Sequence, residues 1–263
     1  MQREPSPAEF AQALETVYVR NPCGVLPNAL WKTLREIESC RRRLSGSMAE
    51  PDALMLWDER RLLVAWTADG AITPTIEDRL RRSDLALLHE KMVPPAGLSR
   101  FSHQEDFFRL SIDLGQAAPC KRPPTLDAVP ANLPEDAAKI ASFVSSCYEG
   151  IRLSEEHVVA WSEHPPFSPD LWIWIRETRS GRTVALGIAE HDPSIEDVSL
   201  EWIQVCRSAR RRGIGRALVG ELLERGRALG RIATVSGQVG SAAERLYRSC
   251  GFSGDDVWWC VRT

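Results

Sequence analysis

The sequence lacks any long apolar run and any strong excess of charge. Its longest apolar stretches, such as residues 85–88, fall far short of the ~20 residues that cross a bilayer. The first residues, Met1 to Pro5, lack the apolar centre of a signal peptide. Basic residues number 33 and acidic residues 36, which gives a net charge of −3 and disfavours general binding of nucleic acid. We therefore expect a cytoplasmic protein that acts without a membrane or nucleic acid.

Clustered metal ligands and paired cysteines are also missing. The seven cysteines never form C-x-x-C, and the five histidines form no motif such as H-E-x-x-H. This pattern disfavours a disulfide framework and predicts no metal site. Apolar residues make up 43% and charged residues 26% of the chain, as in an ordinary globular protein rather than a fibrous or disordered one.

Proline is concentrated in one place, residues 116–134, where five prolines stand close together. Such a stretch is typical of a connector, because proline removes backbone donors and restricts the residue before it. We place a domain boundary there, with one domain over residues 1–121 and a second over residues 122–263. In the first domain we expect helices at 7–18, 26–44 and 76–91 and strands at 54–57, 62–66 and 107–112. We find no internal repeat there.

The second domain has a clearer pattern. Strands are expected at 126–129, 171–175, 183–190, 198–205, 232–235 and 257–262, and helices at 134–148, 154–161, 213–229 and 241–249. Hairpin-linked strands come first, and strands separated by helices follow. The predicted fold class is therefore α+β, with a mixed, mostly antiparallel sheet flanked by helices.

The loop between the strand at 198–205 and the helix at 213–229 carries the clearest chemical signal. Its sequence, Cys-Arg-Ser-Ala-Arg-Arg-Arg-Gly-Ile-Gly-Arg over residues 206–216, combines five arginines with two glycines. Glycine lets a backbone approach a ligand closely, and the first amides of a helix have no partners within it. Such a helix end binds phosphate well. The loop is predicted to hold a pyrophosphate.

Other phosphate motifs fit less well. A Walker loop would end in G-K-[ST], which is absent, and Leu218 occupies the third small position of a dinucleotide fingerprint. A solvated basic helix start and a basic patch for nucleic acid remain alternative interpretations of the loop.

Two motifs together resemble the GNAT superfamily of acyl-coenzyme A-dependent N-acetyltransferases. Arg210-x-x-Gly213-x-Gly215 is similar to the family signature [Q/R]-x-x-G-x-[G/A], and residues 243–252 are similar to its A-x-x-L-Y-x-x-x-G-F ending. The resemblance covers about residues 122–263 and leaves the first 121 residues unexplained. Those residues would cover the substrate, mediate dimerisation or form a degenerate second copy of the fold.

The resemblance implies that acetyl-coenzyme A is the acyl donor and that it lies between two splayed strands. The backbone of the strand would hold the pantetheine arm, and loop amides would hold the pyrophosphate. One departure is Gly240, where the family often has asparagine; Ser241 is the expected replacement contact. The implied cofactor-binding residues are Ile203, Gln204, Val205, Arg210, Arg211, Arg212, Gly213, Ile214, Gly215, Arg216 and Ser241.

Two residues are candidates for catalysis. Tyr247 resembles the family's general acid, because a phenol with a pKa near ~10 can protonate a departing thiolate. Glu201 is the candidate base, since period-two alternation puts Ser199, Glu201 and Ile203 on one strand face. A packing role for Tyr247 and an ion pair for Glu201 are the alternatives.

Other groups are alternative candidates for the base, and several tryptophans are candidates for the walls of the acceptor site. The rival bases are Glu149, Glu190, His191 and a water chain. Tryptophans at 172, 174, 202, 258 and 259 would favour an apolar or cationic acceptor if they line a cleft, although core positions are the commoner role for tryptophan.

The sequence thus predicts an enzyme that moves an acetyl group to a primary amine of a small molecule by direct attack. Two alternatives remain: a non-catalytic acyl-coenzyme A sensor or scaffold, and an acetyltransferase acting on protein N-termini or lysines. A longer acyl group in place of acetyl and a homodimer are both left open.

Overall fold

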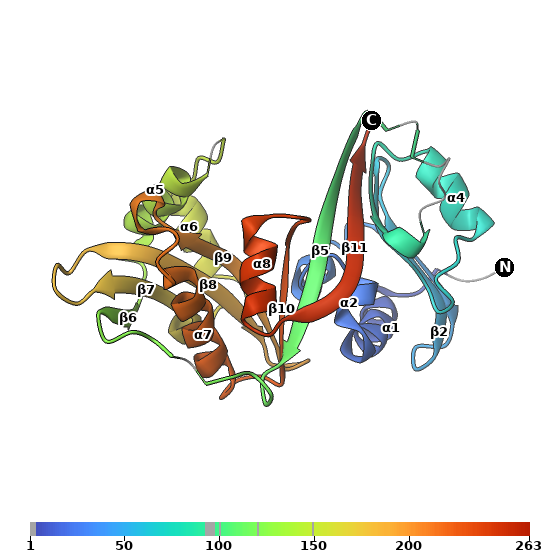
Figure 1. Ribbon diagram of the computed structural model, residues 1–263. Coiled ribbons are helices and arrows are strands. Elements are labelled where there is room, and N and C mark those ends of the chain that lie inside the picture. The colour runs from blue at the N-terminus through green and yellow to red at the C-terminus, as the bar shows by residue number, and fades with distance from the viewer. Residues whose placement is uncertain (1–3, 93–97, 100, 120, 149) are drawn as a thin grey trace. The chain divides into compact units, whose positions relative to one another are not determined.

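The computed structural model describes residues 4–92, 98–99, 101–119, 121–148 and 150–263 (Figure 1). The chain forms two compact units. The N-terminal unit contains residues 1–111, 236–244 and 254–263, and the C-terminal unit contains residues 112–235 and 245–253. The chain therefore does not divide at a single point, as a boundary near residue 121 would require. None of the described helices combines the length and apolar character that crossing a membrane demands.

The N-terminal unit places six strands in the order β1-β2-β3-β4-β11-β5. Its helices are α1 (Pro7–Arg20), α2 (Pro22–Val25), α3 (Leu30–Leu34) and α4 (Pro74–Arg81), with a 3₁₀ turn at Glu90–Met92. Its strands are β1 (Arg41–Gly46), β2 (Pro51–Trp57), β3 (Arg61–Thr67), β4 (Leu85–His89), β5 (His103–Asp113) and β11 (Ser253–Arg262).

Two of the helices expected in this unit extend too far. The helix expected at 26–44 is wrong beyond α3, because residues from Arg41 onward pair antiparallel with β2. The helix expected at 76–91 ends at Arg81, and residues from Leu85 onward form β4, which pairs with both β3 and β11. In both places strand pairing between distant residues overrides a local helical pattern.

The C-terminal unit places its strands in the order β6-β7-β8-β9-β10. They are β6 (Leu126–Pro130), β7 (Trp172–Glu177), β8 (Thr183–Asp192), β9 (Asp197–Val205) and β10 (Ile232–Gln238). Its helices are α5 (Ala137–Cys147), α6 (Glu155–Ser162), α7 (Ile214–Gly226) and α8 (Ala242–Ser249), with 3₁₀ turns at Pro169–Leu171 and Arg207–Ala209. All pairs are antiparallel except β9 with β10, which confirms the predicted mixed sheet.

Helices cover both faces of this second sheet. On one face Leu186 and Ile188 of β8 join a core with residues of α5 and α6. On the other face Gly187 lies so close to α7 that a methyl group there would collide with Leu218 and Leu222. The alternation of β8 thus separates an α5/α6 face from an α7 face (Figure 1).

The two units repeat one topology. In the N-terminal unit β1, β2 and β3 form an antiparallel meander, and β4 follows α4 and runs parallel to β3. In the C-terminal unit β7, β8 and β9 form the meander, and β10 follows α7 and runs parallel to β9. The repetition has no counterpart in the sequence, and it favours a degenerate second copy of the fold among the roles expected for the first part.

Candidate active site

The two parallel strands of the C-terminal unit pair over only part of their length. β10 pairs with β9 from Ile232 opposite Asp197 to Val235 opposite Leu200, whereas β9 continues to Val205. Over residues 202–205, β9 pairs with β8 along one edge, and among the described residues no strand pairs with its other edge. Backbone amides and carbonyls on the other edge are therefore able to bind an extended ligand.

The pairing ends at a β-bulge. Ile188 of β8 lies opposite Trp202 and Ala189 lies opposite Leu200, so Glu201 is the extra residue of β9. The alternation expected for Ser199, Glu201 and Ile203 is therefore wrong, because Ser199 pairs with Glu190 and Ile203 with Gly187, which face opposite sides of β8. Bulges of this kind re-aim side chains and are common beside active sites.

The arginine-rich loop leads from β9 into an α7 helix whose first turn lacks a side-chain cap. The N-cap residue is Gly213, which has φ of 78°. Because glycine has no side chain, it cannot cap the helix amides. A Cβ atom added at Gly213 would meet nothing within 4 Å, so the space beside this N-cap residue is open. Arg211 also has positive φ, at 64°. Such a backbone is costly for a side-chain-bearing residue and is often retained at ligand sites.

The arginines surround this helix end in different ways. Arg210 donates from Nε to the carbonyl oxygen of Val205 at 3.1 Å, which ties the loop to the last residue of β9. Arg212 pairs with Glu177 at 3.0 Å. Arg211 and Arg216 are exposed, as are the other two. The site therefore combines helix amides that have no partner within α7 and no side-chain cap from Gly213 with a cluster of cations, an arrangement that suits a phosphate anion.

Three of the residues expected to bind the cofactor also have a role in the structure of the protein. Ile214 is buried in the core. A methyl group on Gly215 would lie 3.1 Å from Leu246 of α8, so this glycine faces the protein interior and permits close packing of α7. The Ser241 hydroxyl accepts a hydrogen bond from the Glu244 amide at 3.2 Å and caps α8.

Tyr247 lies on α8 and is only 6% exposed. Its ring contacts that of Phe252 edge to face, with centroids 5.7 Å apart. Burial raises the pKa of Tyr247, and the negative charges of Tyr148, Cys250 and Glu201 raise it further. The two candidate catalytic residues, Tyr247 and Glu201, are thus within electrostatic range of each other, and the Tyr247 hydroxyl stays protonated at neutral pH.

An aromatic cluster lies on the α5/α6 face of β9, beside the bulge. The ring of Trp202 stacks on that of Trp161 from α6, with centroids 5.3 Å apart, and meets the ring of Tyr148 edge to face at 5.9 Å. Trp161 and Trp202 are half-buried, and Tyr148 is 40% exposed. Ring faces of this kind are able to bind an apolar or cationic group.

Gln204 shares that face, because it lies opposite Leu186 in the strand register. Its side chain is buried, and neither its amide oxygen nor its amide nitrogen makes a hydrogen bond with described residues. The amide lies near the Tyr148 hydroxyl: burial raises the pKa of Tyr148, and the amide partly offsets that rise. Beyond this weak contact with Tyr148 the buried amide makes no hydrogen bond of good geometry with described residues, so it has capacity to bind a polar ligand group.

The remaining sequence candidates fall in several places. Glu149 lies outside the described residues. Glu190 is buried on β8 opposite Ser199, and the next residue, His191, is half-buried. Trp172 and Trp174 are fully buried in the core under α5 and α6, while Trp258 and Trp259 belong to the N-terminal unit. Of the five tryptophans considered, Trp202 alone lies at the bulge.

Sequence reasoning missed Tyr148 and Trp161. Both lie at helix ends that the sequence placed correctly, but nothing in a local pattern shows which strand they face. By spacing Tyr148 continues the apolar stripe of Ile140 and Val144, so no signal in the sequence separates it from the core.

Comparisons with known proteins agree with this geometry. Residues 169–254 match the family described as acetyltransferase (GNAT) domain, which covers β7 to α8 and the loop of the candidate site. No curated protein matches the sequence.

Solved structures resemble the whole chain. A GCN5-related N-acetyltransferase from Sphaerobacter thermophilus is 19% identical with a TM-score of 0.65, over 99% of this chain and 94% of that one. A GNAT-family acetyltransferase from Colwellia psychrerythraea is 13% identical with a TM-score of 0.65, over 98% and 97%. A tandem GNAT protein from the clavulanic acid biosynthesis pathway is 12% identical with a TM-score of 0.57, over 97% and 95%. At these identities the likeness shows the fold, and it extends that fold to the N-terminal unit.

Proposed function

We propose that this chain, which carries a GNAT acetyltransferase domain over residues 169–254, transfers an acetyl group from acetyl-coenzyme A to a primary amine of a small molecule. The observation that carries the proposal is the uncapped N-terminus of α7. It follows directly on the part of β9 that β10 leaves unpaired, and four exposed arginines surround it.

The residues present fit the acyl donor. The amides that follow Gly213 and the side chains of Arg210, Arg211 and Arg216 would hold the pyrophosphate, and Arg212 would join them on leaving Glu177. The backbone of residues 203–205 would hold the pantetheine arm along the open edge of β9. The Ser241 hydroxyl already accepts a hydrogen bond from the Glu244 amide as a helix cap. It would donate its own O–H to the acyl donor.

The chemistry is the direct attack of an amine on a thioester. The donor supplies an activated carbonyl, to which the amine nitrogen forms a new bond as the carbon–sulfur bond breaks. Glu201 accepts the proton that the ammonium group must lose, directly or through water. Tyr247 donates a hydrogen bond to the sulfur as it leaves, and the second proton of the attacking nitrogen passes to that thiolate through the Tyr247 hydroxyl or through water. The raised pKa makes the Tyr247 hydroxyl a weak acid that stays protonated, so its favoured contribution is a hydrogen bond to the developing thiolate.

The acceptor binds on the aromatic cluster. Tyr148, Trp161 and Trp202 offer ring faces to an apolar or cationic body, and Gln204 offers an amide donor and acceptor. Trp202 and Gln204 flank Ile203, whose backbone is assigned to the donor, so the two substrates would meet across one strand. Three ring systems of this size favour a compact amine over a long protein segment.

A crystal structure of the complex with coenzyme A tests the assignment of the donor site. We expect the pyrophosphate at the N-terminus of α7 and the sulfur within hydrogen-bond distance of the Tyr247 hydroxyl. A pyrophosphate bound elsewhere, or a sulfur remote from Tyr247, contradicts the proposal.

A further inference from the structure

The N-terminal unit contains a cavity of about 310 Å³ that the proposed reaction does not use. It lies between β1 and α4, with Met55 and Trp57 of β2 in its lining. The remaining lining residues are Glu4, Arg41, Arg42, Arg43, Leu44, Thr75, Asp78, Arg79 and Arg82. Five of these side chains are arginines, although the chain as a whole has a net charge of −3.

Regular secondary structure brings these arginines together. Arg41 and Arg43 lie opposite Trp57 and Met55 in the β1–β2 register, so all four project from one face of the sheet. Met55 and Trp57 also pack in the core that α4 covers. On α4 and its C-cap, the lining residues Thr75, Asp78, Arg79 and Arg82 follow the spacing i, i+3, i+4, i+7 and form one stripe.

Two of the five arginines are balanced by acids. Arg82 pairs with Asp78 at 3.0 Å. Arg42 lies 3.9 Å from Glu4, and its guanidinium donates to the carbonyl oxygens of Ile37 and Cys40. Arg41, Arg43 and Arg79 have no carboxylate within ion-pair distance among the residues that the structure describes. The cavity therefore has an excess of three positive charges.

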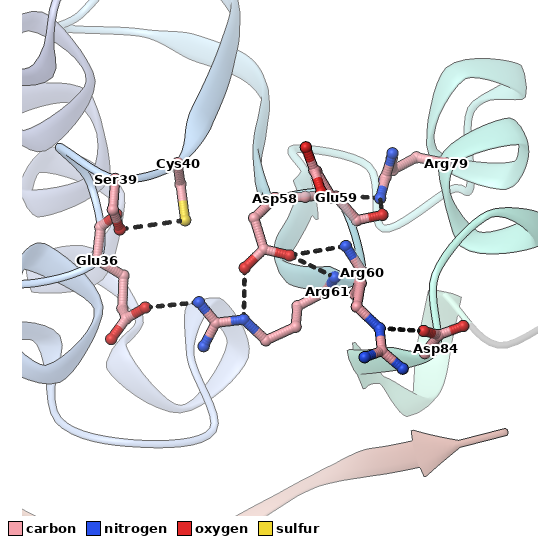
Figure 2. Close-up of polar contacts among 9 residues, drawn as sticks. All are labelled: Glu36, Ser39, Cys40, Asp58, Glu59, Arg60, Arg61, Arg79 and Asp84. Carbon is pink, nitrogen blue, oxygen red and sulfur yellow. Dashed lines mark hydrogen bonds and ion pairs between the residues drawn. The ribbon is translucent and has the colours of Figure 1, made fainter.

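The three unbalanced guanidinium groups are each held in place by neutral partners. Arg79 donates to the carbonyl oxygens of Asp58 and Glu59 at 2.6 and 2.7 Å, at the turn between β2 and β3 (Figure 2). Its Nε is buried and makes no hydrogen bond with described residues. Arg43 donates to the Thr75 hydroxyl at 3.2 Å, and the Arg41 guanidinium lies 5.7 Å from the centre of the Trp57 ring.

We propose that this cavity binds a small molecule that carries a phosphate dianion on a flat apolar body. The three guanidinium groups line one cavity without a carboxylate partner among the described residues, and their planar donors match the oxygens of a phosphate. The ring of Trp57 and the side chain of Met55 offer an apolar surface beside that charge. The proposal is independent of the acetyl transfer.

A different explanation of the arginines is protection of an edge. β1 is the outer strand of its sheet, and charged side chains on an edge strand discourage pairing with another chain. That role concerns β1 alone. It accounts for neither the stripe on α4 nor the attachment of Arg79 to the β2–β3 turn.

Calorimetric titration of the full chain with phenyl phosphate at low salt tests the proposal. Apart from any binding at the N-terminus of α7, which Gly213→Val removes, we expect one saturable site that weakens as salt rises. Inorganic phosphate should bind more weakly, because it lacks the apolar body, and phenol should not bind, because it lacks the charge. Arg43→Gln and Arg79→Gln should each weaken binding of phenyl phosphate by about tenfold or more, as expected for the loss of a charge-assisted hydrogen bond.

Two controls separate this cavity from other basic surfaces. Arg81→Gln removes an α4 arginine that pairs with Glu77 and does not line the cavity, and it should leave the affinity unchanged. Gly213→Val alters the loop before α7 and should also leave it unchanged. The proposal is overturned if no binding is found, if Arg43→Gln binds as well as wild type, or if Gly213→Val alone abolishes binding. Self-association of Arg41→Gln/Arg43→Gln without loss of phenyl phosphate affinity would assign the arginines to edge protection.

Discussion

The three tyrosines of the chain occupy three different environments, and only that of Tyr247 combines burial with the charge of the candidate base Glu201. Tyr18 is buried in the N-terminal unit, where its hydroxyl accepts a hydrogen bond from Arg109 at 3.0 Å. Tyr148 is 40% exposed at the aromatic cluster. Tyr247 is buried within range of the Glu201 charge, and burial raises its pKa. At the scale of single residues, burial keeps Tyr247 protonated, so its hydroxyl is a hydrogen-bond donor over the working pH range.

Tyr247→Phe removes the hydroxyl and keeps the ring that packs on Phe252. If the hydroxyl acts only in the transition state, kcat should fall by about 10²–10⁴ while the affinity for acetyl-coenzyme A stays nearly constant. Steady-state kinetics with calorimetric titration of coenzyme A provide both values. A fall in kcat of less than about tenfold would show that Tyr247 is a packing residue.

The raised pKa of Tyr247 also predicts how stability depends on pH. In the unfolded chain a tyrosine ionises near pH ~10, whereas the folded protein resists that ionisation. The contribution of Tyr247 is therefore fully present below about pH 10 and is lost as pH rises further. Relative to wild type, Tyr247→Phe should gain in free energy of unfolding between pH 9 and pH 11, as measured by urea denaturation. An unchanged difference across that range would mean that Tyr247 ionises as freely in the folded protein.

At the scale of elements, α4 and α7 hold equivalent places in the two units but end differently. The N-terminus of α4 is capped by the Thr73 hydroxyl, which accepts a hydrogen bond from the Ile76 amide at 3.3 Å. The preceding loop carries Asp69, whose carboxylate accepts a hydrogen bond from the Ala71 amide. The N-terminus of α7 has Gly213 and four arginines. At the first helix the Thr73 hydroxyl already occupies an N-terminal amide, whereas at the second no side chain does, so the pyrophosphate of the acyl donor should bind at the N-terminus of α7.

Substitution of glycine in the α7 loop tests that assignment. Gly213→Val places a side chain in the open space beside this N-cap residue, in a backbone conformation that costs about 1–2 kcal/mol for a side-chain-bearing residue. The KM for acetyl-coenzyme A should rise at least tenfold, with little change in the KM for the amine.

Gly70→Val is the matched control, because Gly70 also has positive φ and its nearest neighbour lies 3.9 Å away, but it belongs to the N-terminal unit. It should lower stability to a similar extent and leave both KM values unchanged. Equal effects of the two substitutions on the KM for acetyl-coenzyme A would remove the donor from this loop.

The sequence predicts these elements well where a local pattern and the final packing agree. The strands β7 and β8 are nearly continuous apolar runs bounded by turn residues, the helix α7 has a helical apolar stripe, and both patterns survive in the structure. The bulge at Glu201 could not be predicted, since it depends on pairing with β8, and it changes the face on which Ser199 lies. The role of Gly215 could not be predicted for the same reason. The motif suggests contact with a phosphate, whereas a Cβ atom added there would face Leu246, which is distant in the sequence.

At the scale of the whole molecule, the last residues of the sequence, 254–263, belong to the N-terminal unit. β11 lies between β4 and β5 in the N-terminal sheet, and Val261 is buried in that core. The Trp258 indole donates to the carbonyl oxygen of Cys23 at 2.8 Å, and the buried ring of His89 contacts Asp256 at 2.9 Å. The first part of the sequence therefore depends on the last residues for its fold.

Removal of residues 254–263 should unfold the N-terminal unit, because β4 and β5 lose the strand between them. We expect hydrogen exchange of the β4 amides to become fast in the shortened chain. A fragment of residues 1–111 should likewise fail to give the sharp thermal transition of the full chain, whereas adding residues 254–263 as a separate peptide should restore protection. Native-like protection of β4 in the fragment alone would show that β11 is dispensable.

The central claim is that this molecule catalyses acetyl transfer to an amine, and thiol release tests it most directly. Wild-type protein is incubated with acetyl-coenzyme A and each member of a panel of primary amines that vary in charge and aromatic content, and free thiol is measured with time. The account predicts release that depends on the amine, that is strongest for compact amines with an apolar or aromatic body, and that is nearly lost in Tyr247→Phe. Tight binding of acetyl-coenzyme A without amine-dependent release of thiol for any amine would contradict it and identify the protein as an acyl-coenzyme A sensor.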